Sequence, residues 1–438
     1  MARGDGREST VPHTSIRRLL AGRAALWTAF ALVHAALVGL NVWGQGWPLG
    51  DVVAVYRVWA ESAADGFVRM GIDTPWVYPI LAFAPMAASL AFGADAYGYT
   101  WLGIIVVLDA IAFSILLGRR RLSRTRRLAA WWWMAFLALL GPIAIGRIDA
   151  VTVPLAVTGL IWAAGRPRVA AVLLTIGAWV KVWPVALVAA LVIAARRRLE
   201  VVIIATALSL GILVVSLLAG SGLNAFGFIA EQAGRGLQIE APLAVGWLWQ
   251  IVGGSQRVEI VYDRAILTFQ IHGPGADVAA ALTTPLMIVG VVAVLLVGIR
   301  AARRGAPIGR LLAPLALSLT VVLMLANKVG SPQFATWLAA PVILGLVLRP
   351  RRFLVPAVIA AVIAALTQVI YPYWYGWLLA AHPGFVLAVT AKAALLIALL
   401  AWGIRAVWQA GDGRTPVGRV PAESWPDRQV ESAEESAD

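Results

Sequence analysis

The chain contains no cysteine and few histidines, and only 13% of its 438 residues are charged. Without cysteine there is no disulfide framework, no thiolate nucleophile and no thiolate-bound metal. The four histidines are scattered, at positions 13, 34, 272 and 382, whereas a histidine-rich metal site needs them clustered. We therefore expect neither a metal nor a cofactor.

Apolar residues are abundant instead. They make up 61% of the chain, which includes 20 Trp, and the mean hydropathy is +0.83. Long apolar runs recur from about residue 24 to about residue 406, and runs such as 201–219 do not alternate between apolar and polar as barrel strands do. The sequence predicts an all-α polytopic membrane protein with one transmembrane domain, 24–408.

The net charge of +14 has a topological explanation. No basic stretch lies on a soluble fold with interleaved aromatics, so we expect no nucleic-acid partner. Of 36 Lys and Arg, 27 fall in seven places that the positive-inside rule assigns to the cytoplasm. These places are the tail to Arg23, 119–127, 166–168, 196–198, 300–310, 349–352 and the tail from Arg405.

Both termini are predicted to be cytoplasmic. The basic tail 1–23 precedes an apolar segment without a clear cleavage pattern, which is typical of an uncleaved anchor. The tail 409–438 is rich in Pro, Gly and charge, and we expect it to be disordered. The predicted location is a bacterial plasma membrane.

An even number of crossings must separate each pair of cytoplasmic segments. The stretch 79–93, with Pro79 and Pro85, is therefore predicted to be an interfacial or re-entrant helix. Between Arg168 and Arg196, the sequence Lys181-Val-Trp-Pro184 predicts two short helices and a water-accessible notch. Twelve crossings result: 24–44, 97–117, 128–146, 149–164, the broken pair, 199–219, 277–299, 311–326, 333–348, 353–370 and 384–404.

Polar side chains concentrate in two long external loops, 45–96 and 220–276, and in short turns near residues 327–332 and 371–383. Asp51 follows the first crossing closely, behind Pro48-Leu-Gly50. A helix beginning near Asp51 would place residues 52, 55, 56 and 59 on one apolar face resting on the membrane. Such a helix would hold the Asp51 carboxylate beside lipid-borne substrates.

Four stretches, taken in order, carry a resemblance to a known family. They are Gly50-Asp-Val-Val-Ala-Val-Tyr-Arg-Val-Trp59 with Val77-Tyr-Pro79, Gly146-Arg-Ile-Asp149, Gly177-Ala-Trp-Val-Lys-Val-Trp-Pro184, and Asn327-Lys-Val-Gly-Ser-Pro-Gln-Phe-Ala-Thr-Trp337. From about residue 24 to about residue 345 the chain resembles glycosyltransferases of the GT-C superfamily. Within it the chain is most similar to family 87, which includes polyprenol-phosphate-mannose-dependent mannosyltransferases of actinobacterial glycolipid synthesis.

The resemblance implies inverting transfer of a sugar, with mannose favoured by the family alone, from a polyprenyl-phosphate donor to a lipid or glycolipid acceptor on the external face. It assigns Asp51 as the general base, which takes the proton of the attacking hydroxyl. The leaving phosphate is already acidic and needs positive charge rather than a second carboxylic acid. The external loops have no Asp-x-Asp pair, which favours a metal-independent reaction.

Candidate substrate-binding residues accompany Asp51. Lys181, Arg235 and Lys328 are candidates for the phosphate site, although both lysines could also be snorkelling. Arg147 and Asp149 either pair with each other or support the site. The remaining candidates are Tyr56, Arg57, Trp59, Tyr78, Asn327 and Gln333.

Two other classes remain open, a secondary transporter and a lipid-linked sugar flippase. A transporter would also have many helices, broken segments and intramembrane charges, but it should show two related halves and polar residues near the midplane. A flippase would share the groove for the lipid tail, and it would not need Asp51.

Overall fold

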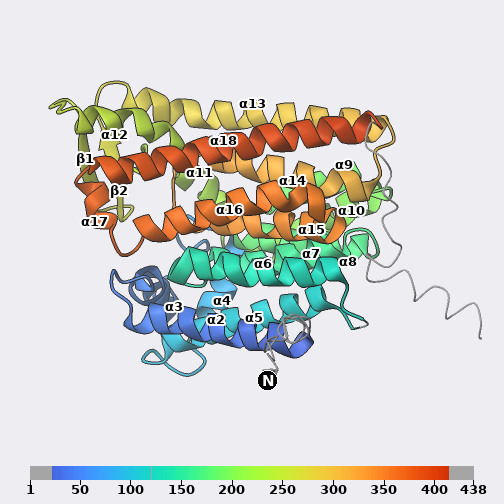
Figure 1. The fold of residues 1–438 in the computed structure, drawn as a ribbon. Coiled ribbons are helices and arrows are strands. Elements are labelled where there is room, and N and C mark those ends of the chain that lie inside the picture. Colours follow the sequence, from blue (N-terminus) through green and yellow to red (C-terminus); the bar gives the residue numbers. More distant parts are fainter. Residues whose placement is uncertain (1–21, 120, 414–438) are drawn as a thin grey trace, which may run out of the picture.

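The computed structural model describes residues 22–119 and 121–413, and these residues are mostly helical (Figure 1). Within them, eight helices are long and apolar enough to cross a membrane. They are α2 (Arg23–Trp43), α5 (Tyr97–Leu117), α6 (Arg124–Leu140) continued by η3 (Gly141–Ala144), α10 (Arg198–Leu218), α13 (Ala276–Arg303), α14 (Ile308–Leu325), α16 (Pro350–Ile370) and α18 (Pro383–Gly411).

Four shorter apolar helical segments correspond to the remaining predicted crossings. They are α7 (Asp149–Trp162), α8 (Pro167–Val180), α9 (Val185–Ala194) and η6 (Pro332–Leu338) continued by α15 (Ala339–Leu348). The helices α7 and α15 are almost entirely buried, whereas α10 and α13 expose most of their apolar side chains. The buried helices α7 and α15 are thus short, although the 18-residue α14 is also mostly buried, and the exposed helices α10 and α13 are long enough to meet lipid. The total of twelve crossings stays a prediction.

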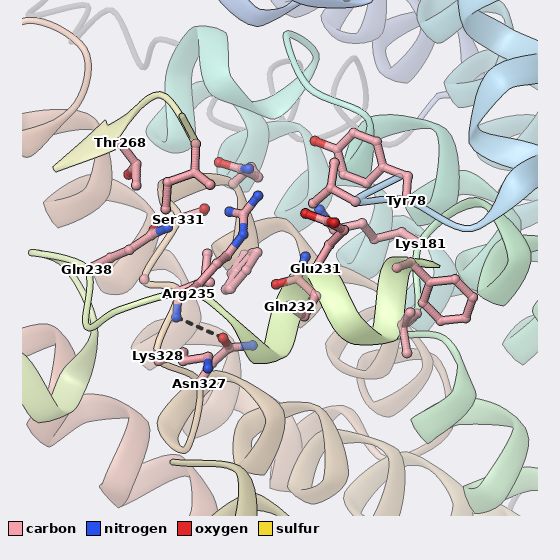
Figure 2. A pocket seen from close by; sticks show the side chains of 18 of the residues that line it. Tyr78, Lys181, Glu231, Gln232, Arg235, Gln238, Thr268, Asn327, Lys328 and Ser331 are labelled. Carbon is pink, nitrogen blue, oxygen red and sulfur yellow. Dashed lines mark hydrogen bonds between the residues drawn. The ribbon is translucent and has the colours of Figure 1, made fainter. Parts of the chain in front are cut away.

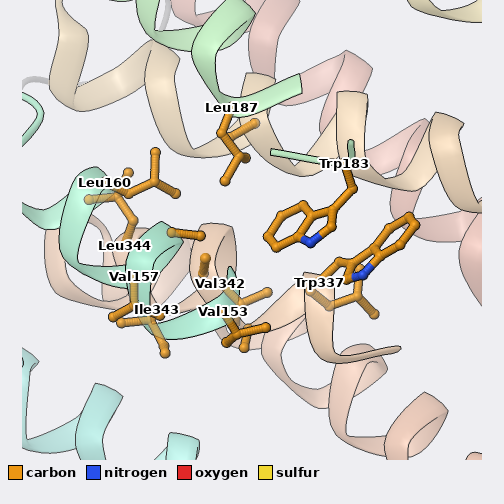
Figure 3. Close-up of a cluster of buried hydrophobic side chains, with 14 of the residues drawn as sticks. Val153, Val157, Leu160, Trp183, Leu187, Trp337, Val342, Ile343 and Leu344 are labelled. Carbon is orange, nitrogen blue, oxygen red and sulfur yellow. The ribbon is translucent and has the colours of Figure 1, made fainter. Parts of the chain in front are cut away.

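The packed interior joins α7, α9 and α15 (Figure 3). Val153 and Val157 of α7 and Ile343 of α15 are buried in it, together with Trp183 and Leu187. Close approach between α15 and α16 depends on Gly345, because a Cβ there would lie 2.0 Å from the Phe353 ring. Small residues serve this purpose in membrane bundles, where van der Waals packing is a main source of helix association.

The predicted break between residues 168 and 196 is confirmed. Helix α8 ends at Val180, Lys181 has an extended backbone, and Pro184 caps the start of α9. Proline disfavours a helical conformation in the residue before it and lacks the N–H that would continue the helix. The break lies partway along the bundle, because Trp179 at the end of α8 donates a hydrogen bond to Ser209 in the middle of α10.

The first loop folds into short elements: η1 (Val52–Tyr56, a π-helical turn), α3 (Arg57–Ala64), η2 (Ile80–Ala82) and α4 (Phe83–Ala88). The helix expected near Asp51 is present, but the prediction that its apolar face rests on the membrane is wrong. Val52 and Tyr56 are buried in the protein, and the Tyr56 ring lies 5.3 Å from that of Trp101 in α5. The helix packs on α5 because an aromatic surface is available there.

The second loop is more structured than an all-α prediction allows. It contains η4 (Gly222–Phe226), α11 (Gly227–Ala233), η5 (Pro242–Ala244), α12 (Val245–Val252) and an antiparallel hairpin of β1 (Glu259–Asp263) and β2 (Thr268–His272). The Asn224 side chain donates a hydrogen bond to the Ile72 carbonyl at 2.8 Å, which ties this loop to the first. The two loops and the short helix α17 (Tyr375–Leu379) lie at one end of the bundle, the loop-rich end (Figure 1).

The opposite end of the bundle, the arginine-rich end, carries the interhelical arginines and the C-terminus of α18. Helix α18 continues through Gly411, beyond the crossing 384–404 and into the segment predicted to begin the tail at residue 409. Residues 1–21 and 414–438, which hold most of both predicted tails, are outside the described residues.

Candidate active site

A cavity of about 790 Å³ lies at the loop-rich end of the bundle, between the two long loops (Figure 2). Its walls come from the first loop, the break between α8 and α9, the second loop, α13 and the turn before η6. Ten of the candidate residues line it: Asp51, Tyr56, Trp59, Tyr78, Arg147, Lys181, Arg235, Asn327, Lys328 and Gln333. Arg57 and Asp149 do not.

Asp51 is held at the wall by Arg147. Arg147 Nε lies 3.0 Å from Asp51 Oδ2, and the carboxylate is 47% exposed whereas the arginine side chain is 6% exposed. Burial acts to lower the pKa of Arg147, but Asp51 and the nearby tyrosines outweigh it, so the pKa is raised and the guanidinium stays charged. The candidate base is therefore oriented and still reachable from the cavity.

The guanidinium of Arg147 also holds the backbone around Asp51. Its Nη1 donates to the carbonyls of Pro48 and Gly146, and its Nη2 donates to the Tyr371 hydroxyl at 2.6 Å. Gly146 is required beside it, because a Cβ there would lie 2.6 Å from Asn41 Oδ1. Arg147 thus pairs with Asp51 and not with Asp149, which excludes the first of the two alternatives left by the sequence.

Asp149 supports Lys181 from behind the wall. The buried carboxylate accepts a hydrogen bond from Trp337 Nε1 at 2.7 Å, and its other oxygen lies 3.8 Å from Lys181 Nζ. Lys181 Nζ also sits 4.6 Å from the centre of the Tyr78 ring. Lys181 is therefore fixed by a carboxylate and a ring face, and it faces the cavity rather than snorkelling away from it.

Arg235 and Lys328 form a second cationic group on another wall of the cavity (Figure 2). Burial lowers the pKa of Arg235, and burial followed by the charge of Arg235 lowers that of Lys328. Arg235 has no salt bridge among the described residues, and its Nε is buried without a hydrogen-bond partner. Tyr78, Glu231 and Asp263 act in the opposite direction on the pKa of Arg235, so its charge is partly compensated, and the two cations together are a candidate site for an anion.

Aromatic rings line the wall beside Asp51. Trp76 packs edge-to-face against Trp59 and Tyr78, with ring centres 5.5 and 5.4 Å apart. The hydroxyls of Tyr56 and Tyr78 are 3.5 Å apart. Burial, followed by the hydroxyl of Tyr78 and the charge of Asp51, raises the pKa of Tyr56 well above its usual value. Tyr56 therefore stays neutral, and this wall offers ring faces and hydroxyl groups.

Several lining residues were missed from the sequence. Trp76 directly precedes the quoted stretch Val77-Tyr-Pro79, and its aromatic side chain was a usable signal. Tyr371 and Glu231 sit in predicted external segments, but nothing local distinguishes them from other loop residues. Glu240 also lines the cavity, where it is already bound to Lys392 of α18 at 2.9 Å. Arg57, in contrast, lies 3.9 Å from Glu61 along α3, outside the cavity.

One side of the cavity is apolar and reaches the outer surface. Val182 at the break and Ile229 of α11 line it, and these side chains are 45% and 60% exposed. Thr284 and Met287 of α13 continue this side along a helix whose outer face is apolar. The cavity thus connects the polar interior with a surface suited to a hydrocarbon chain.

Among residues 22–119 and 121–413, no three His, Asp or Glu side chains gather as a metal site would require. Comparisons of the chain with protein-family models, with curated proteins and with solved structures found no match.

Proposed function

We propose that this protein is an integral membrane glycosyltransferase that moves a sugar from a polyprenyl-phosphate donor to a lipid or glycolipid acceptor. The observation that carries the proposal is the composition of one cavity. A reachable carboxylate, Asp51, shares it with a separate cationic group, Arg235 and Lys328, and with aromatic walls. A sugar phosphate on a lipid chain needs each of these surfaces, together with an apolar exit for the chain.

In the proposed reaction, Asp51 accepts the proton of an acceptor hydroxyl while the hydroxyl oxygen attacks the anomeric carbon. The bond between that carbon and the donor phosphate oxygen breaks, and polyprenyl phosphate leaves with the bonding electrons. Arg235 and Lys328 stabilise the charge that develops on the phosphate. Attack opposite the leaving group inverts the anomeric configuration, in agreement with the single-base mechanism that the family resemblance implies.

Arg147 and Lys181 have distinct parts in this proposal. Arg147 donates to Asp51 and to Tyr371, so it fixes the direction of the carboxylate. Lys181 stands above Tyr78 and extends the positive potential of the cavity. The partly exposed ring of Trp59 offers an apolar face for sugar C–H groups.

The test is sugar transfer by purified protein in lipid nanodiscs, with labelled polyprenyl-phosphate mannose as donor and membrane lipid extract as acceptor. Replacing a general base lowers the rate by about 10²- to 10⁴-fold, so Asp51→Asn should lose nearly all activity. Asp65→Asn, at an exposed acid of the same loop, is the matched control and should retain it. Glu231→Gln tests the other exposed carboxylate of the cavity.

The outcomes separate the candidates. Equal transfer by wild type and Asp51→Asn would refute the assignment of the base, and loss in Glu231→Gln alone would move that role to Glu231. If no labelled prenyl-phosphate sugar is transferred while the donor moves between leaflets of proteoliposomes, the protein is a flippase instead.

A further inference from the structure

Helix α18 carries one charged residue in its apolar stretch, residues 383–404. This residue is Lys392, and its side chain is only 14% exposed. Its Nζ lies 2.9 Å from Oε2 of Glu240, a residue of the second loop whose side chain is 3% exposed. A charge inside a membrane helix is costly and rare, so the pair calls for an explanation.

Stability alone does not account for this ion pair. A buried ion pair is often no more stabilising than well-packed apolar side chains of similar volume, because both charges lose their contact with water. The ion pair adds register, since the ammonium group must meet one carboxylate oxygen. The pair therefore fixes the position of Glu240 along α18 more narrowly than an apolar contact would.

Glu240 belongs to a short segment, residues 237–241, that lies between the hairpin and the turn carrying Lys328. On one side, the backbone of this bridging segment forms hydrogen bonds of 3.2 and 2.8 Å with β2. On the other side, the Gln238 N–H donates to the Lys328 carbonyl at 2.9 Å, and both side chains lie at the cavity (Figure 2). The bridging segment thus links the ion pair with the turn.

Gly330 brings the turn into direct contact with the bridging segment. A Cβ at Gly330 would lie 2.0 Å from the carbonyl carbon of Glu240 and 2.2 Å from the backbone N of Ala241, so only glycine fits there. The two backbones touch without a flexible side chain between them. A shift of Glu240 must therefore move the turn, and Lys328 with it.

We propose that Glu240 and Lys392 are positioning residues that hold Lys328 where it meets the phosphate of the lipid-linked substrate. This inference rests on the proposed function, in which Arg235 and Lys328 stabilise the leaving phosphate. Glu240 stands at the cavity wall, but Lys392 neutralises its charge, so the carboxylate does not repel an anion. The ion pair acts on the substrate through the bridging segment.

The test compares the binding of undecaprenyl phosphate and of undecaprenol to the full-length protein in lipid nanodiscs. The ratio of the two affinities, the phosphate preference, separates the contribution of the phosphate from that of the hydrocarbon chain. The variant E240Q/K392M removes the ion pair and leaves the net charge unchanged, so a general change in potential cannot explain a loss. Losing one hydrogen bond to a charged group corresponds to about 10- to 100-fold in affinity, and we expect the phosphate preference to fall by this factor.

Two control variants accompany this measurement. E259Q/R405M also removes one acid and one base, from exposed positions of the same loop and the same helix, and it should keep the wild-type phosphate preference. Lys392→Arg keeps a cation opposite Glu240 and should retain most of the preference.

A second measurement, in the background of Lys328→Met, separates positioning from a purely structural role. If Glu240 and Lys392 act through Lys328, adding E240Q/K392M to Lys328→Met lowers the phosphate preference no further. A pair that only stabilises the fold would act independently of Lys328, and the two losses in binding free energy would add.

Gly330→Ala tests the same contact from the other side if E240Q/K392M does not fold. The new Cβ pushes the turn away from the bridging segment without any change in charge, so this variant must show the same loss and the same dependence on Lys328.

Three results would overturn the proposal while wild type still prefers undecaprenyl phosphate, which leaves the proposed function standing. They are a wild-type phosphate preference in E240Q/K392M, an equal loss in E259Q/R405M, and a loss that adds to that of Lys328→Met. Equal binding of undecaprenyl phosphate and undecaprenol by wild type would instead refute the proposed phosphate site, and this inference with it.

Discussion

The pair of Asp149 and Lys181 gives the sharpest test of the packing around the cavity. Replacing Lys181 by Met removes the cation and leaves the fully buried Asp149 carboxylate with only the Trp337 hydrogen bond. At the observed 3.8 Å and an effective dielectric constant of about 20, the attraction between the two charges is about 4 kcal/mol. Breaking a buried pair from one side costs about 3–5 kcal/mol. We therefore expect Lys181→Met to lower the free energy of unfolding by this amount.

The assay is a double-mutant cycle in mixed micelles, in which a denaturing detergent unfolds the protein and the free energy of unfolding is measured for each variant. Asp149→Asn keeps an oxygen acceptor for Trp337 and removes the charge, so D149N/K181M should recover most of the stability that Lys181→Met loses. The pair of Arg168 and Glu200 is the control, because it is closer, at 2.9 Å, yet exposed to solvent. It should show little coupling, since water screens exposed ion pairs.

The refuting result is specific. If Lys181→Met is no less stable than D149N/K181M, the two side chains do not act as an ion pair and the account of the cavity wall is wrong. If the double variant is stable but inactive in sugar transfer, Lys181 has a role in the reaction beyond holding the fold.

Two further predictions concern the charges in the cavity. Arg147→Lys should fold, yet its rate of sugar transfer should fall about tenfold to 100-fold with little change in donor affinity. The reason is that one ammonium group cannot satisfy Asp51, the Pro48 carbonyl and Tyr371 together. Steady-state kinetics test this, and an unchanged kcat would contradict it. The pKa of Lys328 is lowered in the folded protein, so between this lowered pKa and the unfolded value of about 10.4 the folded chain binds fewer protons than the unfolded chain. The free energy of unfolding should therefore rise with pH in this range. Donor binding should weaken over the same range, because Lys328 loses its positive charge. Titrations of both quantities should lose this pH dependence in Lys328→Met, and its persistence would exclude Lys328 as the source.

The sequence predicted the course of the chain well. The apolar runs became helices, the sequence Lys181-Val-Trp-Pro184 became a break, and the short proline-containing stretch after Pro79 stayed too short to cross. The hairpin of β1 and β2 was missed, because its strands are only five residues each and pair with each other inside a long polar loop. The expected membrane-facing side of the helix after Asp51 was wrong, because amphipathicity does not distinguish lipid from a protein partner such as Trp101.

The candidate site was predicted in composition rather than in its contacts. The polar external segments and the four family-like stretches supplied twelve candidate residues, and ten of them line the cavity together with many residues that the sequence did not single out. The partners of those residues could not be inferred. Arg147 had a nearby acid in Asp149, two positions away, and it pairs instead with Asp51 from another element.

What the sequence by itself determined is therefore the set of segments that can cross a bilayer and the two groups of loops that join them. This follows from a constraint that acts on each short segment separately, because the backbone of every crossing must satisfy its own hydrogen bonds in lipid. Only the tertiary structure decided which charges meet. Asp149 and Trp337 are 188 positions apart and Arg147 and Tyr371 are 224 apart, so these contacts depend on how the helices pack, and no local pattern specifies them.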